Sequence, residues 1–478
     1  MKKILYIFIL IGFLGVNSCK EKLELEPFDN LDVSVAFETN TDFENAINGV
    51  YSSLRDGNYY GGEFLLLPDV ISDNLIICSE GRTSYSNYYL FSINGNIAWL
   101  NFWRAAYVTI LRANHVLENI DNLPDGDFKN NIEGQALALR AMAHFDLARV
   151  YSKPPQFASS SDLGIAYVTS TDSGERPARV SVADTFAKIE ADLNDAASLI
   201  GDDNGTGFFN KAAVHALRTR FYLYTGDNAK TITAADAAIA ASVNGGVSSI
   251  TEFPKIWKDV SEDGVIFKVI NTALDNVGVG VVYNQKSDVD GIRSEYVPDY
   301  SFYTQYQPTD VRLNSYLETS VFAGNHTFNH VIKYLERTGS GQAVVDMKVL
   351  RWSEVYLSRA EAKAETGDDP GALADLDAVR SNRYTGFVSG GETGAALKAA
   401  IQLERRLELA FEGHRLFDLK RQGLDINRSN NGDYSDGTGV PPPAGALTLP
   451  ASSPKFQMPI PQEELNANPN MQPNPSNG

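Results

Sequence analysis

Cysteine is scarce in this chain, because its 478 residues include only Cys19 and Cys78. If Cys19 is modified, as its position suggests, Cys78 has no partner, so we expect no internal disulfide. Basic residues are also outnumbered, since 41 Lys and Arg stand against 60 Asp and Glu, and the formal charge is −19. A chain this acidic is not expected to bind nucleic acid or an anionic membrane surface.

The sequence also lacks the motifs of common enzyme classes. It has no G-x-S-x-G, H-E-x-x-H, Walker A or G-x-G-x-x-G pattern. His326 and His330 are four residues apart, but a metal site needs a third ligand, and we expect a turn and a strand there. Asp69 and Asp73 keep a glycoside hydrolase open as an alternative. We expect no metal, no cofactor and no catalysis.

The amino terminus has the pattern of a secretion signal. Lys2 and Lys3 precede an apolar run from Ile4 to Gly15, which is shorter than the roughly 20 residues that span a bilayer. The sequence Val-Asn-Ser-Cys, ending at Cys19, resembles a bacterial lipobox. We expect residues 1–18 to be removed, Cys19 to be lipidated and residues 19–40 to form a tether, with an ordinary cleaved signal as the alternative.

Two segments of the chain are alike. Ala216 to Asp227 and Leu357 to Asp368 each read as an amphipathic helix closed by Gly-Asp, and each precedes a second, Ala-rich helix. Looser copies pair residues 131–151 with 181–200, and 42–55 with 102–120. This spacing is typical of tetratricopeptide repeats, whose helix pairs bury their apolar faces only by stacking.

The predicted fold is therefore mostly α, a tetratricopeptide-like solenoid of about four helix pairs within a single domain from residue 41 to 478. Long loop-rich insertions with short strands interrupt the solenoid, and Phe267–Ile270 and Val277–Tyr283 are the predicted strands. The predicted boundaries are helical repeats at 41–55, 102–151, 181–241 and 346–423, insertions at 58–100 and 242–345, and a Pro- and Asn-rich tail at 430–478.

The stretch from Gln402 to Gly423 has the clearest helical period. Apolar residues recur at steps of three and four from Ala400 to Phe417, which predicts one continuous helix. Charged residues follow the same spacing on a neighbouring face, and we interpret them as a structural ion-pair ladder along that helix, made by Arg405, Glu408, Glu412 and Arg415.

The pattern E-R-R-x-E-L-x-x-E-G-x-R-x-x-D-L-x-R-x-G, from Glu404 to Gly423, resembles the carboxyl-terminal signature of SusD/RagB-type nutrient-binding outer-membrane lipoproteins. Other segments resemble further parts of that family's pattern and occur in the same order, namely Trp103–Asn114, Leu139–Tyr151, Lys333–Tyr334, Leu350–Ala362 and Pro459–Pro475.

This resemblance implies a non-catalytic lipoprotein on the outer face of the outer membrane. It would capture a nutrient, here an oligosaccharide or polysaccharide, and deliver it to a SusC-like TonB-dependent transporter. Capture of a peptide and a tetratricopeptide scaffold that binds protein segments stay open as alternatives.

The two insertions are rich in aromatic residues, which can stack on the apolar face of a sugar ring while polar side chains bond its hydroxyl groups. The resemblance to the starch-binding member of the family implies an aromatic arc with Asp, Arg and Asn beside it. We therefore predict ligand contacts from Asp73, Arg82, Tyr88, Tyr89, Trp99, Asn101, Tyr283, Tyr296 and Tyr300.

Overall fold

The computed structural model describes residues 36–201, 204–242, 245–272, 274–275, 277–337 and 343–477. Cys19, the predicted signal peptide and most of the predicted tether lie outside the described residues. Within the described ranges, no helix has both the length and the apolar character needed to cross a membrane.

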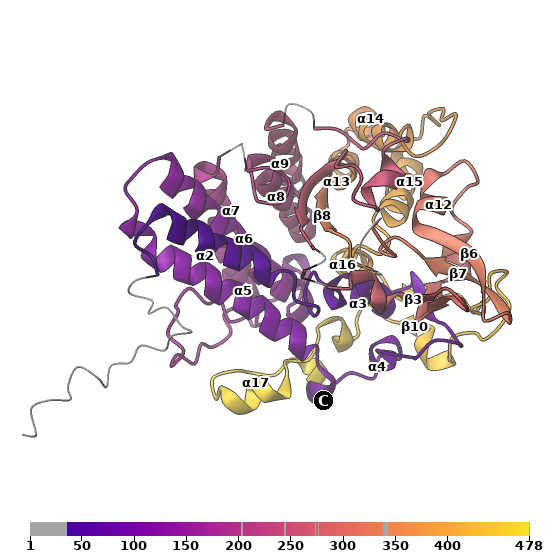
Figure 1. Cartoon of the computed structure of the whole chain (residues 1–478), viewed down its shortest axis with the longest axis horizontal. Coiled ribbons are helices and arrows are strands. Elements are labelled where there is room, and N and C mark those ends of the chain that lie inside the picture. Colours follow the sequence, from indigo (N-terminus) through magenta and orange to yellow (C-terminus); the bar gives the residue numbers. More distant parts are fainter. Residues whose placement is uncertain are drawn as a thin grey trace, which may run out of the picture.

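Helices dominate the structure, and the strands are short (Figure 1). The helices are α2 (Asn40–Ser53), α3 (Glu63–Ile71), α4 (Ser86–Tyr89), α5 (Leu100–Asn119), α6 (Asp127–Tyr151), α7 (Val182–Leu199), α8 (Lys211–Thr225), α9 (Asn228–Ala240), α10 (Phe253–Ile256), α11 (Tyr300–Tyr303), α12 (Val311–Tyr316), α13 (Trp352–Glu365), α14 (Asp369–Arg380), α15 (Gly394–Glu408), α16 (Arg415–Gln422) and α17 (Gln462–Ala467). The strands are β1 (Leu75–Ile77), β2 (Val265–Val269), β3 (Asn284–Ser287), β4 (Gly291–Ser294), β5 (Tyr296–Pro298), β6 (Leu317–Phe322), β7 (His326–Val331), β8 (Met347–Arg351), β9 (Ile426–Asn427) and β10 (Thr448–Leu449).

The predicted helix pairs are present. Helix α2 packs on α5, α6 on α7, α8 on α9 and α13 on α14, and contacts between α7 and α8 and between α9 and α13 join successive pairs. In Figure 1 the first two pairs lie at the left, α8 and α9 lie in the middle, and α13 to α15 lie at the upper right. The mostly helical, tetratricopeptide-like prediction is confirmed.

The two Gly-Asp turns explain why the repeats could be read from the sequence. Gly226 and Gly367 adopt φ values of 77° and 87°, a left-handed conformation that glycine tolerates and that ends a helix. The next residue then starts the following helix, because the side chain of Asp227 accepts from the backbone N–H of Lys230, and that of Asp368 accepts from Gly371.

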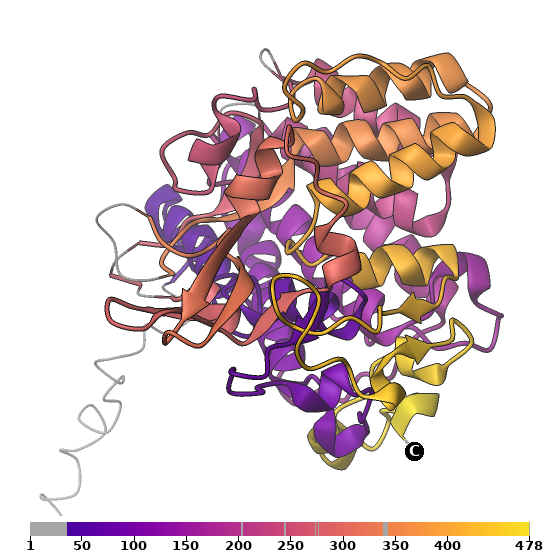
Figure 2. The same ribbon diagram turned by 90° about the vertical axis from the view of Figure 1, so that its right-hand side faces the viewer.

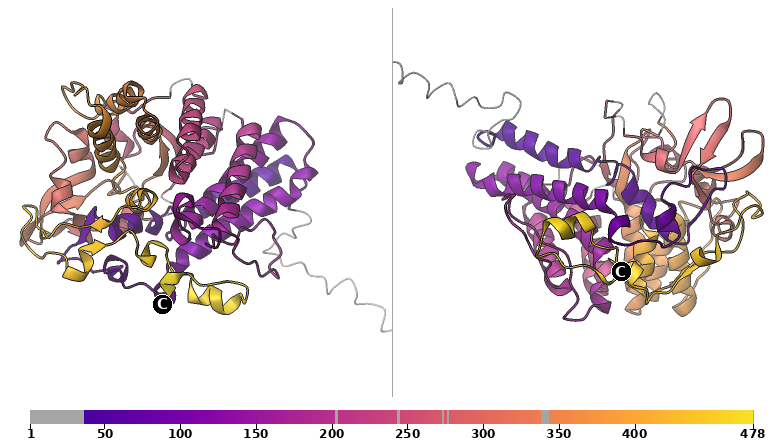
Figure 3. Two further views of the ribbon diagram at one scale, coloured as in Figure 1. Left: turned by 180° about the vertical axis from the view of Figure 1, so that it is seen from behind. Right: turned by 90° about the horizontal axis from the view of Figure 1, so that it is seen from below.

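The strands form five two-stranded antiparallel sheets within the described residues. Strand β1 from the first predicted insertion pairs with β5 from the second, with Leu75 opposite Pro298. Figure 2 and the left panel of Figure 3 show most strands at one side of the molecule, beside the helices, with the yellow carboxyl-terminal tail at the bottom, and the view from below in the right panel of Figure 3 shows this tail crossing the underside.

One predicted strand is confirmed and the other is wrong. Strand β2 covers most of Phe267–Ile270, but Val279–Val282, within the second predicted strand, is a 3₁₀ turn. The backbone of Gly280 packs so tightly there that a Cβ atom would lie 2.0 Å from the carbonyl oxygen of Tyr334. Close approach to another segment, rather than pairing in a sheet, determines this conformation.

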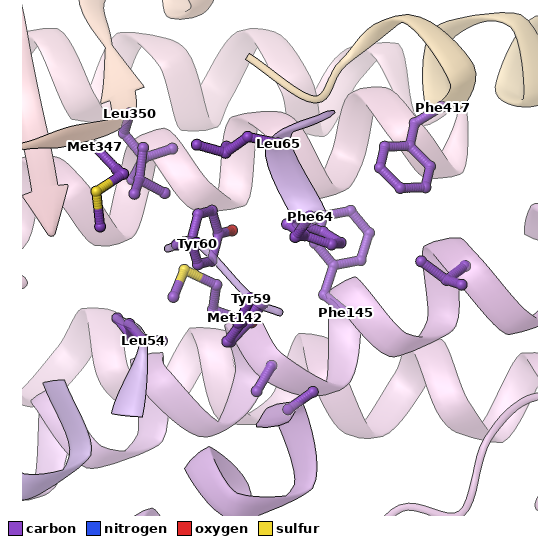
Figure 4. Close-up of a cluster of buried hydrophobic side chains, with 14 of the residues drawn as sticks. Leu54, Tyr59, Tyr60, Phe64, Leu65, Met142, Phe145, Met347, Leu350 and Phe417 are labelled. Carbon is purple, nitrogen blue, oxygen red and sulfur yellow. The ribbon is translucent and has the colours of Figure 1, made fainter. Parts of the chain in front are cut away.

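A buried aromatic cluster joins the first insertion to the helical pairs (Figure 4). The hydroxyl groups of Tyr59 and Tyr60 donate to Asp146 on α6 at 2.6 and 2.9 Å. Asp146 also pairs with Arg149, whose guanidinium lies 4.4 Å from the ring centre of Phe417 on α16. Residues of α6, α16 and the first insertion therefore share one core.

The continuous helix predicted from Ala400 to Phe417 is wrong. Helix α15 ends at Glu408 and α16 begins at Arg415, and in the intervening segment Phe411 and Gly413 have φ values of 66° and 77°. A Cβ atom on Gly413 would lie 2.9 Å from the carbonyl oxygen of Phe64 in α3. The apolar stripe is real, but packing against α3 divides it between two helices.

The charged residues of this stretch form buried ion pairs, although their partners differ from those of the predicted ladder. Glu408 pairs with Arg351 and Arg383, which come from β8 and from the segment after α14. Three further ion pairs also join residues from different elements, namely Arg405–Asp418, Glu412–Lys333 and Arg415–Asp73. These charges hold separate elements together instead of stabilising one helix.

Candidate functional site

Trp99 does not present a ring to a ligand. Its side chain is 1% exposed and packs against Phe64 and Phe102, with ring centroids 5.8 and 4.8 Å away. The indole N–H donates to Glu63 at 3.2 Å. A sugar needs an accessible aromatic face, and the buried ring of Trp99 does not offer one in this structure, where the residue is part of the core.

Four more of the predicted ligand residues are buried, namely Asp73, Tyr89, Tyr283 and Tyr296. The guanidinium of Arg428 lies 4.0 Å from the ring centre of Tyr89, and the hydroxyl of Tyr283 donates to the carbonyl oxygen of Phe411 at 3.0 Å. Asp73 accepts two bonds from Arg415, at 2.7 and 2.9 Å. Burial alone would raise the pKa of Asp73, but Arg415 holds it below its ordinary value.

The remaining predicted residues, Arg82, Tyr88, Asn101 and Tyr300, are partly or fully accessible. Asn101 lies near the start of α5, and the hydroxyl of Tyr88 donates to the carbonyl oxygen of Ala98 at 3.2 Å. Arg82 is half exposed and bonds Glu295 at 2.5 Å. Tyr300 lies nearly parallel to Tyr303, with ring centroids 6.2 Å apart.

Accessible aromatic side chains gather where the two insertions meet the tail. We call this surface the loop face, and its side chains are Arg82, Tyr300, Tyr303, His326 and Tyr434. The imidazole of His326 stacks on Tyr434 at 4.3 Å and also bonds Glu80 at 2.7 Å. The hydroxyl groups of Tyr303 and Thr319 lie 3.4 Å apart, which connects α11 to β6.

The tail contributes to the loop face through a glycine-rich turn. The backbone N–H of Ser435 donates to Thr327 in β7 at 2.8 Å, and Gly437 lies against the ring of Tyr300. A Cβ atom on Gly437 would lie 2.5 Å from that ring. We did not predict Tyr434 as a ligand residue, because only the fold brings this part of the tail beside the β6–β7 hairpin.

The carboxylates around the loop face are already bonded to protein groups. Glu295 pairs with Arg82, Glu80 bonds His326, and Asp433 accepts from the backbone N–H of Ser79 at 2.7 Å. Within the described ranges, no group of three or more His, Cys, Asp or Glu residues could hold a metal ion. The accessible chemistry at this surface is ring stacking and hydrogen bonding.

The acidic pair considered for a glycosidase is sealed from solvent. Burial raises the pKa of Asp69 to about 7, and its side chain accepts from Asn74 at 2.6 Å. Asp73 is held by Arg415, as described above. In this structure neither carboxyl group faces a surface where a glycosidic bond could be placed.

Two family models match the chain. One is described as "SusD family" and covers residues 219–476, just over half of the 478 residues. This chain belongs to the SusD family. The other model is described as "Starch-binding associating with outer membrane" and covers residues 23–223.

Individual SusD-family relatives resemble the chain over nearly its whole length. SusD-like protein P2 of Formosa agariphila is 25% identical, and the alignment covers 99% of this chain and 98% of the relative. SusD-like protein P38 of the same organism is 24% identical, with 88% and 91% covered. The crystal structure of a SusD superfamily protein from Bacteroides thetaiotaomicron superposes with a TM-score of 0.81 at 26% identity, covering 91% of this chain and 100% of that protein.

Proposed function

We propose that this SusD-family protein is a lipid-anchored protein of the cell surface that captures a glycan at the loop face. Binding would be non-catalytic, and the glycan would pass to a SusC-like TonB-dependent transporter in the outer membrane. The anchor would be the lipidated Cys19. Family membership carries the proposal, and the description of the second matching model supports both starch-type ligands and the outer membrane.

The chemistry of the loop face suits a glycan. Tyr300 and Tyr303 offer a tandem pair of rings, and the stacked imidazole of His326 and phenol of Tyr434 offer a second. Arg82 adds an accessible guanidinium at the edge. Two stacking platforms with polar neighbours match successive sugar rings, which alternate apolar C–H faces with hydroxyl rims.

Calorimetry on the full chain, purified in detergent, tests this proposal with a panel of neutral oligosaccharides and one peptide mixture. We expect one glycan to bind saturably without being cleaved. Tyr300→Ala should weaken that binding about tenfold, or ~1.4 kcal/mol, because it removes a stacking ring without opening the core. Tyr356→Ala is the matched control, because Tyr356 is a partly buried tyrosine on α13 outside the loop face.

Each outcome has a distinct meaning. Equal loss of affinity in Tyr300→Ala and Tyr356→Ala would contradict the placement of the site at the loop face. If only the peptide mixture gives heat of binding, the captured nutrient is a peptide and not a glycan. If shortened glycans appear as products, the protein cleaves its ligand, which would contradict a purely binding role. Co-purification of a TonB-dependent transporter with the tagged protein from native membranes tests the delivery step.

A further inference from the structure

A cavity of about 550 Å³ lies between the segment that follows α6 (residues 153–157), helix α16 and the tail segment 451–457. We call it the tail cavity. Its walls include Phe157, Lys420, Leu424, Ser452 and Gln457, and none of the predicted ligand residues lines it. Its volume falls within the range of roughly 300–1,000 Å³ that small-molecule sites occupy.

Lys420 places a buried positive charge in the wall of the tail cavity. Its side chain is 5% exposed, and its ammonium group donates to the carbonyl oxygens of Arg149 and Val150 in the last turn of α6, at 2.6 and 3.4 Å. In the described part of the chain, no carboxylate lies within 4.0 Å of it to form an ion pair. The dipole of α6 offsets part of this charge, but a buried ammonium group ordinarily has an anionic partner.

The nearest charged neighbour does not supply that partner. Arg149 carries the same sign as Lys420, and its own carboxylate partner is Asp146. Burial, with a further contribution from Arg149, lowers the pKa of Lys420 to about 7. An anion in the tail cavity would therefore stabilise the charged form of Lys420.

Gln457 is a second polar residue at the tail cavity. Its side chain is 7% exposed, and its amide makes no hydrogen bond to any described residue. Its backbone groups are already used, because the N–H donates to Pro454 and the carbonyl oxygen accepts from Ser476. The side-chain amide thus offers one acceptor and two donors to a ligand.

An aromatic ring lies at the same cavity. Phe157 is 52% exposed, so a face of its ring is accessible to a ligand in the cavity. Its ring packs beside the backbone of Gly423, where a Cβ atom would lie 3.1 Å from the ring. Leu424, two residues after the end of α16, adds a further accessible apolar group to the wall.

We propose that the tail cavity binds an anionic sugar unit, a pyranose bearing a carboxylate. Lys420 pairs with the carboxylate, the amide of Gln457 bonds the hydroxyl groups, and Phe157 stacks on the C–H face of the ring. A cation, an amide and an aromatic ring in one cavity match the three kinds of surface on a uronic acid. The site is separate from the loop face, so this inference does not depend on where neutral glycans bind.

Titration of the full chain in detergent with trigalacturonate, and with maltotriose as the neutral counterpart, tests this site. We expect trigalacturonate to bind saturably and maltotriose not to compete for the tail cavity. Phe157→Ala, Gln457→Met and Lys420→Met should each weaken binding of the uronate at least tenfold. Lys398→Met is the matched control, because Lys398 is a half-exposed lysine on α15.

The outcomes separate this site from the loop face. If Lys420→Met does not fold, Phe157→Ala and Gln457→Met still decide the question, because neither removes a bond within the protein. Absence of uronate binding, or uronate binding that only Tyr300→Ala weakens, would overturn the tail cavity as a site while leaving capture at the loop face intact. Binding of a sulfated sugar but of no uronate would overturn the assignment of a carboxylate.

Discussion

Replacing Glu408 by Gln should destabilise the protein severely, because Glu408 is the centre of a buried charge network. Its carboxylate accepts from Arg351 at 2.7 Å, from Arg383 at 2.8 and 2.9 Å, and from Arg312 at 3.2 Å. Glu408 itself is 0% exposed. The network links Arg312, Lys333, Arg351 and Arg383 to Asp310, Glu404, Glu408 and Glu412, and Arg380 and Glu392 extend it from Glu404.

The Gln side chain keeps the shape of Glu408 but removes one negative charge, and its NH₂ group cannot accept from a guanidinium. Breaking a buried ion pair by removing one partner costs ~3–5 kcal/mol, because the other charge stays buried. We therefore expect Glu408→Gln to lower the free energy of unfolding by about this amount, measured by urea unfolding of both proteins.

Glu365→Gln provides the comparison. Glu365 pairs with Lys398 at 2.8 Å, but the two side chains are 45% and 42% exposed. A solvated pair of this kind contributes roughly 0–1 kcal/mol, so this variant should unfold almost like the parent. If Glu408→Gln lowers the free energy of unfolding no more than Glu365→Gln does, the reasoning is refuted, and buried charge does not hold α15, β8 and the segment after α14 together.

Three further predictions follow from the core. Trp99→Ala should lower the free energy of unfolding, measured in urea, by ~3–5 kcal/mol. If this variant is as stable as the parent but loses affinity for the glycan, Trp99 stacks on the ligand instead. Gly413→Ala should lower the thermal midpoint, because φ is 77° and the new Cβ would meet Phe64; an unchanged midpoint would contradict that close contact. Acid should unfold the protein as the pH falls below about 4.5, the ordinary pKa of Glu361. Burial alone would raise the pKa of Glu361 and Asp418, but Arg421 and Arg405 lower both, so these carboxylates stabilise the fold above their unfolded-state pKa values and lose that contribution as they are protonated. Circular dichroism between pH 7 and 2 checks this, and stability that rises on acidification would refute it.

The helical scaffold was predictable because its signals are local. A glycine that ends a helix and an aspartate that starts the next one lie side by side in the sequence at Gly226-Asp227 and Gly367-Asp368, and no distant residue is needed to interpret them. Strand β2 was likewise predictable from its own residues, without reference to distant segments. The partners of Glu408 and the break at Gly413 depend on α3, β8 and other distant segments, so helical periodicity alone predicted the wrong geometry there.

The candidate site was less predictable for the same reason. An aromatic residue beside Asp and Asn looks the same in the sequence whether it faces solvent or the core, and only packing against Phe64 and Phe102 buries Trp99. Conversely, Tyr434 lies in a glycine-rich tail whose sequence carries no aromatic pattern. It reaches the loop face because the following turn bonds to β7.

The bond from Ser79 to Asp433 joins residues 354 positions apart in the chain. Contacts this distant form late in folding, because loop closure costs entropy before the contact is made, whereas the pairs α8–α9 and α13–α14 can form soon after their own short turns. A chain without its last fifty residues lacks Asp433 and Tyr434 and also the core residues Phe456, Met458 and Ile460, so it cannot complete the loop face. Binding at the proposed loop face therefore depends on these carboxyl-terminal residues, and a chain truncated before them should lose it.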